Sequence, residues 1–134
     1  KTVDNEQKEL SDYLYKEFNL KKNNLVIDIG SNDGSLLKHF KSKGLKTIGV
    51  EPTNIAKIAN QNGIKTIQSF FNEEAAERVL KQEGKAHVIT CTNVFAHMPT
   101  LHDFMLGVVN LMDEDSNFII ENHYILDISF DLKF

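Results

Sequence analysis

The residues most able to do chemistry lie in one short stretch, residues 26–34. Gly30 and Gly34 allow a tight backbone turn and a close approach to a ligand, which a Cβ atom would obstruct. Asp28, two positions before the first glycine, places a carboxylate beneath that turn. About 20 residues later Glu51 ends a second strand-like run, where a carboxylate can accept hydrogen bonds from both hydroxyls of a ribose. The spacing therefore predicts a nucleoside-binding site.

The charge of the turn favours one of two candidate ligands, a dinucleotide or S-adenosyl-L-methionine. A dinucleotide site usually carries G-x-G-x-x-G, and the helix that follows meets a pyrophosphate. Here Ser31, Asn32 and Asp33 separate the two glycines. Asp28 and Asp33 would repel a pyrophosphate and would favour the positive sulfonium and amino groups of S-adenosyl-L-methionine. The alternative without a ligand is an ordinary strand-to-helix turn in which Asp28 bonds only to backbone.

The elements that must position these residues alternate along the chain. Five strand-like runs are predicted, at residues 25–29, 46–50, 65–67, 87–92 and 118–121. The first, fourth and fifth are almost continuously apolar, which is typical of central strands covered on both faces. Helical patterns lie between the runs. This order predicts an α/β fold: a Rossmann-like, doubly wound, mostly parallel sheet with helices on both faces.

The helices are predicted from apolar residues spaced three and four apart. The longest such stripe lies within residues 101–112, and shorter ones lie within residues 10–18, 36–40, 55–59 and 75–80. Gly44, Gly63 and Gly84 follow three of these stripes, where glycine commonly ends a helix.

Length and composition limit the class of protein. The 134 residues, 41% of them apolar and 25% charged, suit one globular domain over residues 1–134. A net charge of −4 offers no positive stripe for nucleic acid. The single cysteine, Cys91, excludes an intrachain disulfide, and no apolar run reaches the ~20 residues of a membrane span. We therefore expect a cytoplasmic protein with a small-molecule partner.

The turn with Asp28 before it, followed by Glu51, resembles the first two motifs of class I S-adenosylmethionine-dependent methyltransferases, with Asn32 in place of the usual middle glycine. This resemblance implies methyl transfer with S-adenosyl-L-methionine as the cofactor. Sheets of that class usually have seven strands, so we expect this fold to be truncated after the fifth strand and the chain to be a fragment of a longer protein. The fifth strand would then be an exposed edge available for pairing.

Later segments resemble the C-methyltransferases that act on nucleotide-linked deoxysugars. Residues 93–97 (Asn-Val-Phe-Ala-His) and 101–104 (Leu-His-Asp-Phe) are similar to that family. Residues 121–127 resemble its E-x-P-Y-L-x-D stretch, with His123 in place of the proline. The similarity covers roughly residues 25–127 and implies a keto-sugar nucleotide as the methyl acceptor. Small-molecule O- or N-methylation stays open, because the cofactor motif does not encode the acceptor.

Carried over residue by residue, the resemblance implies a cofactor site and one residue near the acceptor. The methionine-side loop would consist of Asp28, Gly30, Ser31, Asn32 and Gly34. The ribose would lie against Glu51 and Pro52, the adenine against Phe70, and the amino-acid end of the cofactor against Asn93. His97 matches a histidine near the acceptor and is the one candidate in the chain for a catalytic base.

Two departures from the sugar-modifying family keep other functions open. That family carries an N-terminal zinc module built from cysteine pairs and a downstream Tyr/His-Glu-His segment, and neither is found in residues 1–134. The alternatives are a non-catalytic S-adenosylmethionine-binding module of a larger protein and an NAD-linked oxidoreductase domain, which the acidic turn disfavours.

Several residues are expected to serve the structure. His97 and His102, with Asp103 beside the second, lack a third ligand at a diagnostic spacing, so no metal site is predicted. Cys91 lies within an apolar run and is expected to be a buried hydrophobic residue. Of the adjacent Phe70 and Phe71, one is expected in the core and the other facing the cofactor.

Overall fold

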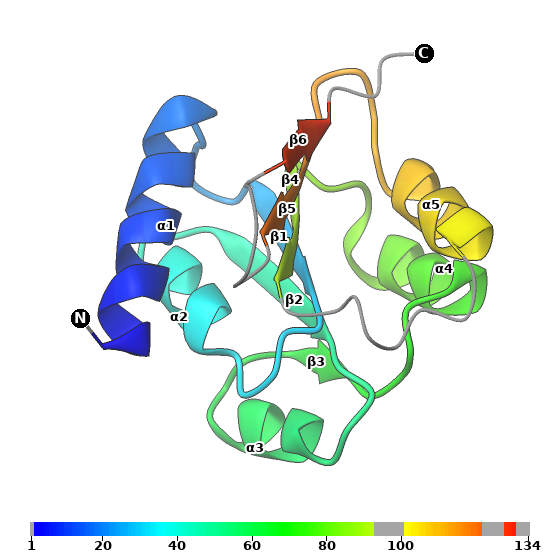
Figure 1. Ribbon diagram of the computed structural model, residues 1–134, viewed down its shortest axis with the longest axis horizontal. Helices are drawn as coiled ribbons and strands as arrows, with labels where there is room; N and C mark the ends of the chain where they lie inside the picture. Colours follow the sequence, from blue (N-terminus) through cyan, green and yellow to red (C-terminus); the bar gives the residue numbers. More distant parts are fainter. Residues whose placement is uncertain (1, 93–100, 122–127, 131–134) are drawn as a thin grey trace.

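One sheet forms the centre of the molecule. The computed structural model describes residues 2–92, 101–121 and 128–130 (Figure 1). The strands are β1 (Leu25–Ile29), β2 (Lys46–Val50), β3 (Thr66–Ile67), β4 (Val88–Thr92), β5 (Asn117–Glu121) and β6 (Ile128–Phe130). They lie in the order β3-β2-β1-β4-β5-β6. Strands β1 to β5 are parallel, and β6 is antiparallel to β5.

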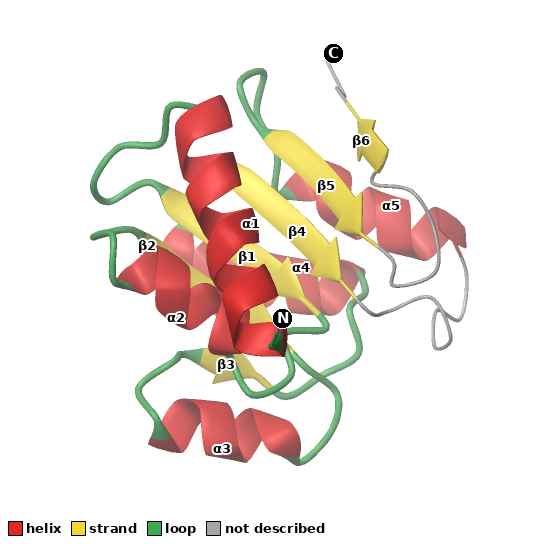
Figure 2. Cartoon of the chain, turned by 60° about the vertical axis from the view of Figure 1, so that its left-hand side comes forward, coloured by secondary structure: helices red, strands yellow, loops and turns green. Residues whose placement is uncertain are grey.

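Helices cover both faces of the sheet, as the alternating pattern predicts. α1 (Val3–Glu17) and α2 (Ser35–Lys41) pack on one face, and α4 (Glu73–Glu83) and α5 (Leu101–Asn110) pack on the other (Figures 1 and 2). α3 (Ile55–Gln61) lies beside β3 at one edge of the sheet (Figure 2). The α/β, Rossmann-like fold is therefore confirmed. Among the described residues, no helix is both long and apolar enough to cross a bilayer.

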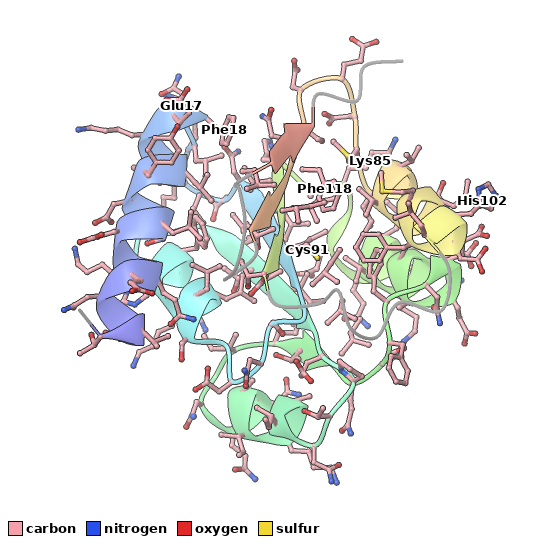
Figure 3. All side chains as sticks on the ribbon, in the orientation of Figure 1. Glu17, Phe18, Lys85, Cys91, His102 and Phe118 are labelled. Carbon is pink, nitrogen blue, oxygen red and sulfur yellow. The ribbon has the colours of Figure 1, made fainter. Side chains whose placement is uncertain are left out.

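Alternation along the strands divides the core into two layers. Ile27 of β1 packs with Phe104 and other residues of α4 and α5, whereas its neighbour Val26 packs with Leu14 and Phe40 on the α1 and α2 side. Cys91 and Phe118 extend from the sheet toward α4 and α5 (Figure 3). Because side chains alternate between faces, Asp28 points to the same side as Val26, toward α1 and α2.

The sequence reading missed the last strand. Five strands were expected, but residues 128–130 form β6, so the prediction that the sheet ends after β5 is wrong. As a consequence β5 is paired on both sides, with β4 and with β6, and is not the exposed edge that was expected to bind a partner. Strand–helix alternation predicts parallel strands joined by helical crossovers, and β6 is antiparallel to β5, which explains the miss.

The glycine turn after β1 lies against a glycine of β2. A Cβ atom at Gly49 would collide with the Oγ and Cβ atoms of Ser31 and would lie 3.2 Å from the Cδ1 atom of Leu37. The side chain of Ser31 thus occupies the space that the missing Cβ leaves. The end of β2 and the turn after β1 form one packed unit.

This packing predicts that Gly49→Ala destabilises the fold by about 1–3 kcal/mol, because the added methyl group overpacks a closed site. In the Ser31→Gly background the same substitution should cost less, since the two colliding atoms are gone. Chemical unfolding of the parent, both single variants and the double variant measures the coupling. Equal costs of Gly49→Ala in both backgrounds would contradict the proposed contact.

Candidate functional site

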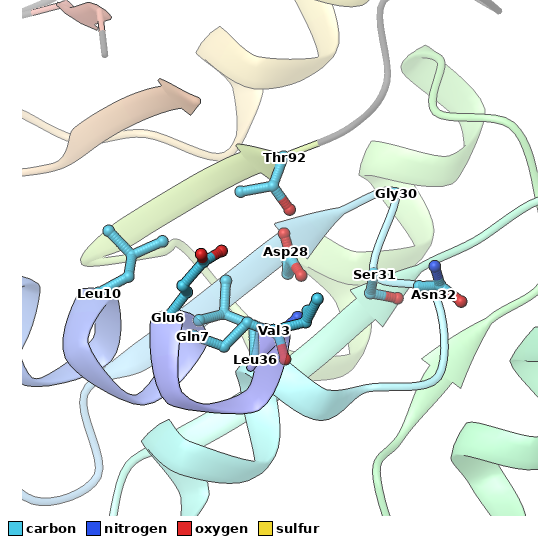
Figure 4. A pocket seen from close by; sticks show the side chains of 10 residues that line it. All are labelled: Val3, Glu6, Gln7, Leu10, Asp28, Gly30, Ser31, Asn32, Leu36 and Thr92. Atoms are coloured by element: carbon cyan, nitrogen blue, oxygen red, sulfur yellow. The ribbon is translucent and has the colours of Figure 1, made fainter. Parts of the chain in front are cut away.

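A cavity of about 120 Å³ lies where the glycine turn passes under α1. Strand order reverses at this point, because β1 is followed along the chain by its neighbour β2 on one side and later by β4 on the other. Open α/β sheets bind ligands at such a position, beyond the carboxyl ends of the strands. The cavity is lined by Val3, Glu6, Gln7, Leu10, Asp28, Gly30, Ser31, Asn32, Leu36 and Thr92 (Figure 4).

The turn depends on left-handed backbone conformations. Asn32 has φ 58° and Gly34 has φ 83°. Asparagine tolerates this region better than most residues with a side chain, which explains how Asn32 can stand where a glycine is usual. At Gly34 a Cβ atom would also lie 2.8 Å from Ile64 Cγ2, so glycine is required there for space as well as for φ.

The backbone N–H groups of the turn face β2. Gly30 N donates to Val50 O at 2.8 Å, Ser31 N donates to the same oxygen at 3.3 Å, and Asn32 N donates to Glu51 Oε1 at 2.9 Å. The start of α2 is also occupied, because the Asp33 carboxylate accepts a hydrogen bond from Ser35 N at 3.0 Å. A pyrophosphate at this turn would have to displace these bonds and face the charge of Asp33.

Asp28 is a buried carboxylate on the wall of the cavity. It is 1% exposed, and its Oδ1 atom accepts a hydrogen bond from Thr90 Oγ1 at 2.8 Å. Thr90 lies opposite Asp28 in the register of β1 and β4. Burial raises the pKa of Asp28 from 3.8 to about 7; the Thr90 hydrogen bond opposes this rise and the charge of Glu51 adds to it. The predicted carboxylate beneath the turn is therefore present.

Glu51 lies on the other side of the turn and is not part of the cavity lining. Its Oε1 atom accepts from Asn32 N, and its Oε2 atom accepts from Thr53 N at 2.9 Å and Thr53 Oγ1 at 2.7 Å. The two acidic residues were expected to face one crevice. In the structure Asn32 lies between them: its N–H bonds Glu51, while the residue lines the cavity that contains Asp28.

The other predicted site residues are distributed as follows. Pro52 is half-buried directly after Glu51. Phe71 is 7% exposed and packs edge-to-face on Phe104 with ring centroids 5.3 Å apart, whereas Phe70 is 53% exposed. The expectation that one of this pair belongs to the core is confirmed, and contact of Phe70 with a cofactor stays a prediction. Asn93 and His97 lie outside the described residues.

Sequence reasoning missed the contribution of α1 and the partners of the carboxylates. Glu6 and Gln7 line the cavity, and Thr90 and Thr53 hold Asp28 and Glu51. Val3, Glu6, Gln7 and Leu10 share one helix face, but because Glu6 and Gln7 are polar the sequence does not mark this face as one that lines a site. The hydrogen bonds of Thr90 and Thr53 to the two carboxylates depend on strand register and loop geometry, which the sequence does not reveal.

Two residues near the turn show how closed the interior is. Cys91 is buried, and burial together with the charge of Asp28 raises the pKa of its thiol to about 12. This confirms Cys91 as a buried hydrophobic residue. Ser31 is 4% exposed, and its Oγ atom has no hydrogen-bond partner in the part of the chain that the structure describes. A buried hydroxyl without a partner is unusual, and here it accompanies the close packing of Ser31 against Gly49.

Comparison with known proteins gives both a family and individual relatives. Residues 4–127 match the methyltransferase domain family. The chain is 32% identical over 122 residues to the C-methyltransferase NovU of Streptomyces niveus, covering 90% of this chain and 29% of NovU. It is 29% identical over 79 residues to the ubiquinone biosynthesis O-methyltransferase of Escherichia fergusonii, covering 55% of this chain and 32% of the enzyme. The chain thus spans about a third of the length of these relatives.

Solved structures of methyltransferases share the fold. The plantazolicin methyltransferase BamL, in complex with a triazolic desmethylPZN analogue and SAH, superposes with a TM-score of 0.70 at 18% identity, covering 91% of this chain and 47% of BamL. Coclaurine N-methyltransferase, bound to N-methylheliamine and SAH, gives a TM-score of 0.67 at 14% identity, covering 90% of this chain and 37% of the enzyme.

The burial of Asp28 predicts an unusual pH dependence of stability. The unfolded chain releases this proton near pH 4 and the folded chain near pH 7, so the stability that the protonated group provides below pH 4 is lost as the pH rises toward 7. Asp28→Asn keeps an acceptor for Thr90 and removes the buried charge. It should raise the free energy of unfolding at pH 8 by on the order of 2–4 kcal/mol, and by less toward pH 4.

Urea unfolding of the parent and Asp28→Asn from pH 4.5 to pH 8 measures this difference. Asp113→Asn is the matched control: hydrogen bonds from Asp115 N and Ser116 lower the pKa of that exposed carboxyl, so its removal should not stabilise the fold at pH 8. A constant difference between parent and Asp28→Asn across this range would show that Asp28 does not titrate as stated.

Proposed function

Because the chain belongs to the methyltransferase domain family, which residues 4–127 match, we propose that residues 1–134 are the S-adenosylmethionine-binding core of a methyltransferase. When bound, S-adenosyl-L-methionine supplies an electrophilic methyl group on a positively charged sulfur. The observation that carries this proposal is the arrangement at the end of β1: a buried carboxylate faces the cavity while the N–H groups of the turn face β2. Such a wall favours a cation over a phosphate.

The residues present fit the two ends of this cofactor. The cavity beside Asp28 is small compared with the roughly 300–1,000 Å³ of sites that enclose a whole ligand, so it suits one end of the molecule. That end would be the amino acid, whose ammonium group complements Asp28. The side-chain amide of Asn32, which lines the same cavity, offers a hydrogen bond beside it.

Glu51, on the far side of the turn, would bind the ribose. Its carboxylate accepts three hydrogen bonds already, and a carboxylate has about four lone-pair sites. The Thr53 hydroxyl is the donor that a ribose hydroxyl can replace, because Thr53 is exposed and can instead bond water. The two N–H donors would keep the carboxylate fixed. Pro52 and Phe70 follow the ends of β2 and β3, where they would border the ribose and the adenine.

The acceptor is proposed to be carbon of a keto-sugar nucleotide or a similar small molecule. Support comes from the similarity to the C-methyltransferase NovU and from the resemblance of residues 93–104 and 121–127 to sugar C-methyltransferases. A carbon beside a carbonyl must lose a proton before it can attack, which requires a positioned base. His97 is proposed for that role, and Asn93 for the amino-acid end of the cofactor.

Calorimetric titration of the 134-residue chain with S-adenosylmethionine, S-adenosylhomocysteine and NAD tests the cofactor. We expect micromolar binding of the first two and none of NAD. Glu51→Gln should weaken both by at least about tenfold, since it removes a charge-assisted acceptor worth roughly 1.5–3 kcal/mol. Unfolding of Glu51→Gln is measured alongside, because the new amide also meets the N–H groups of Asn32 and Thr53.

Glu77→Gln on α4, exposed on the opposite face, is the matched control and should leave every affinity unchanged. Binding of NAD without S-adenosylmethionine would reject the proposal in favour of an oxidoreductase domain. Binding of S-adenosylmethionine by a full-length protein that transfers no methyl group to any tested sugar nucleotide would support a non-catalytic binding module and overturn the acceptor class.

A further inference from the structure

The face of α1 that lies over the cavity is partly polar at the start of the helix and apolar further along it. Val3, Glu6, Gln7 and Leu10 share one face of the helix and line the cavity (Figure 4). One turn further, Leu14 continues that face and is fully buried in the core against α2 and the sheet. A face that packs on a core is normally apolar throughout. Here it becomes polar where it passes over the cavity. Glu6 is exposed and Gln7 is half-buried, so both can meet water as well as a polar ligand group in the cavity.

Glu6 differs from Asp4 and Asp12, two other acidic residues of α1, in its side-chain partners. Asp4 pairs with His39 at 2.9 Å, and Asp12 pairs with Lys43 at 2.7 Å and with Lys8 at 3.0 Å. The carboxylate of Glu6 has no hydrogen-bond or ion-pair partner among the described residues, and it shares the cavity with Asp28. A positive group in the cavity would be attracted to both carboxylates.

Contacts with α2 and with the turn after it fix the position of α1. The pair Asp4–His39 joins α1 to α2. Eight residues further along α1, Asp12 pairs with Lys43 in the turn after α2, and Lys43 Nζ also donates to Ser11 Oγ at 3.2 Å. Leu14 anchors the same helix in the core. Glu6 lies between the two ion pairs along the helix, so its backbone is held in place before any ligand arrives. Such preorganisation reduces the entropy lost on binding.

We propose that Glu6 is a specificity-determining residue that binds the ammonium group at the amino-acid end of the cofactor. In this arrangement α1 covers the cavity that holds that end. The inference rests on the proposed function, because it assigns one end of S-adenosylmethionine to the cavity. That end is chosen because Asp28 and Thr92 lie on the cavity side of the turn, whereas Glu51 lies on the other side. Gln7, beside Glu6, can donate its amide to the carboxylate of the same amino acid.

The test compares ligands that carry this end with one that lacks it. S-adenosylmethionine and S-adenosylhomocysteine carry the amino acid, and 5′-methylthioadenosine lacks it. In Glu6→Gln we expect affinity for the first two to fall about threefold to tenfold, the loss of one partly exposed charge-assisted hydrogen bond. Affinity for methylthioadenosine should stay within twofold of the parent. Glu17→Gln, at the exposed far end of the same helix, removes an identical charge and should change none of the three.

Failure of the inference and failure of the proposed function give different results. If the parent chain binds S-adenosylmethionine but Glu6→Gln weakens no ligand, or weakens methylthioadenosine equally, Glu6 does not read the amino-acid end and the inference is overturned. If the parent binds neither S-adenosylmethionine nor S-adenosylhomocysteine, the proposed function itself fails. A loss specific to the two amino-acid ligands, absent in Glu17→Gln, supports the assignment.

Discussion

The arrangement of the site depends on one costly feature, a carboxylate buried at the end of a central strand. Asp28 points into the layer between the sheet and α1, where its charge is poorly solvated, and among the described residues the hydroxyl of Thr90 on β4 provides its hydrogen bond. Burying such a group destabilises the charged form by several kcal/mol unless a partner compensates. The fold tolerates this cost only at a position where a cavity admits a compensating group, and the cavity lies directly beside Asp28.

The direction of the turn's N–H groups decides which compensating group fits. In a phosphate-binding turn these groups point at the ligand. Here they bond Val50 and Glu51, because Gly49 lacks a side chain and lets Ser31 pack directly on β2. The preference against a pyrophosphate therefore arises from backbone orientation as well as from the charge of Asp28 and Asp33. Gly49 on β2 thus influences which way the N–H groups of the turn after β1 point, although it is not part of that turn.

Periodicity in the sequence predicts the fold because each central strand and helix is long enough to show its pattern. It does not predict β6, which is antiparallel to β5, because strand–helix alternation gives parallel strands. At the site, spacing and charge identify Asp28 and the turn, since both belong to one continuous stretch. They do not reveal that Glu51 lies across the turn from the cavity, because that depends on which N–H groups its carboxylate accepts. Nor do they single out Glu6, whose significance appears only once α1 is placed over the turn.

The two carboxylates are suited to different parts of one ligand because their surroundings differ. Three donors hold Glu51 in one orientation, which suits recognition of neutral hydroxyl groups by geometry. Within the described part of the chain, Asp28 has one hydrogen-bonding side chain, that of Thr90, and burial raises its pKa to about 7, so part of the population is protonated at neutral pH. A cation beside Asp28 favours the ionised form, so its binding is coupled to release of that proton. The cost of burying the charge in the free protein is thus offset when the ligand brings the opposite charge.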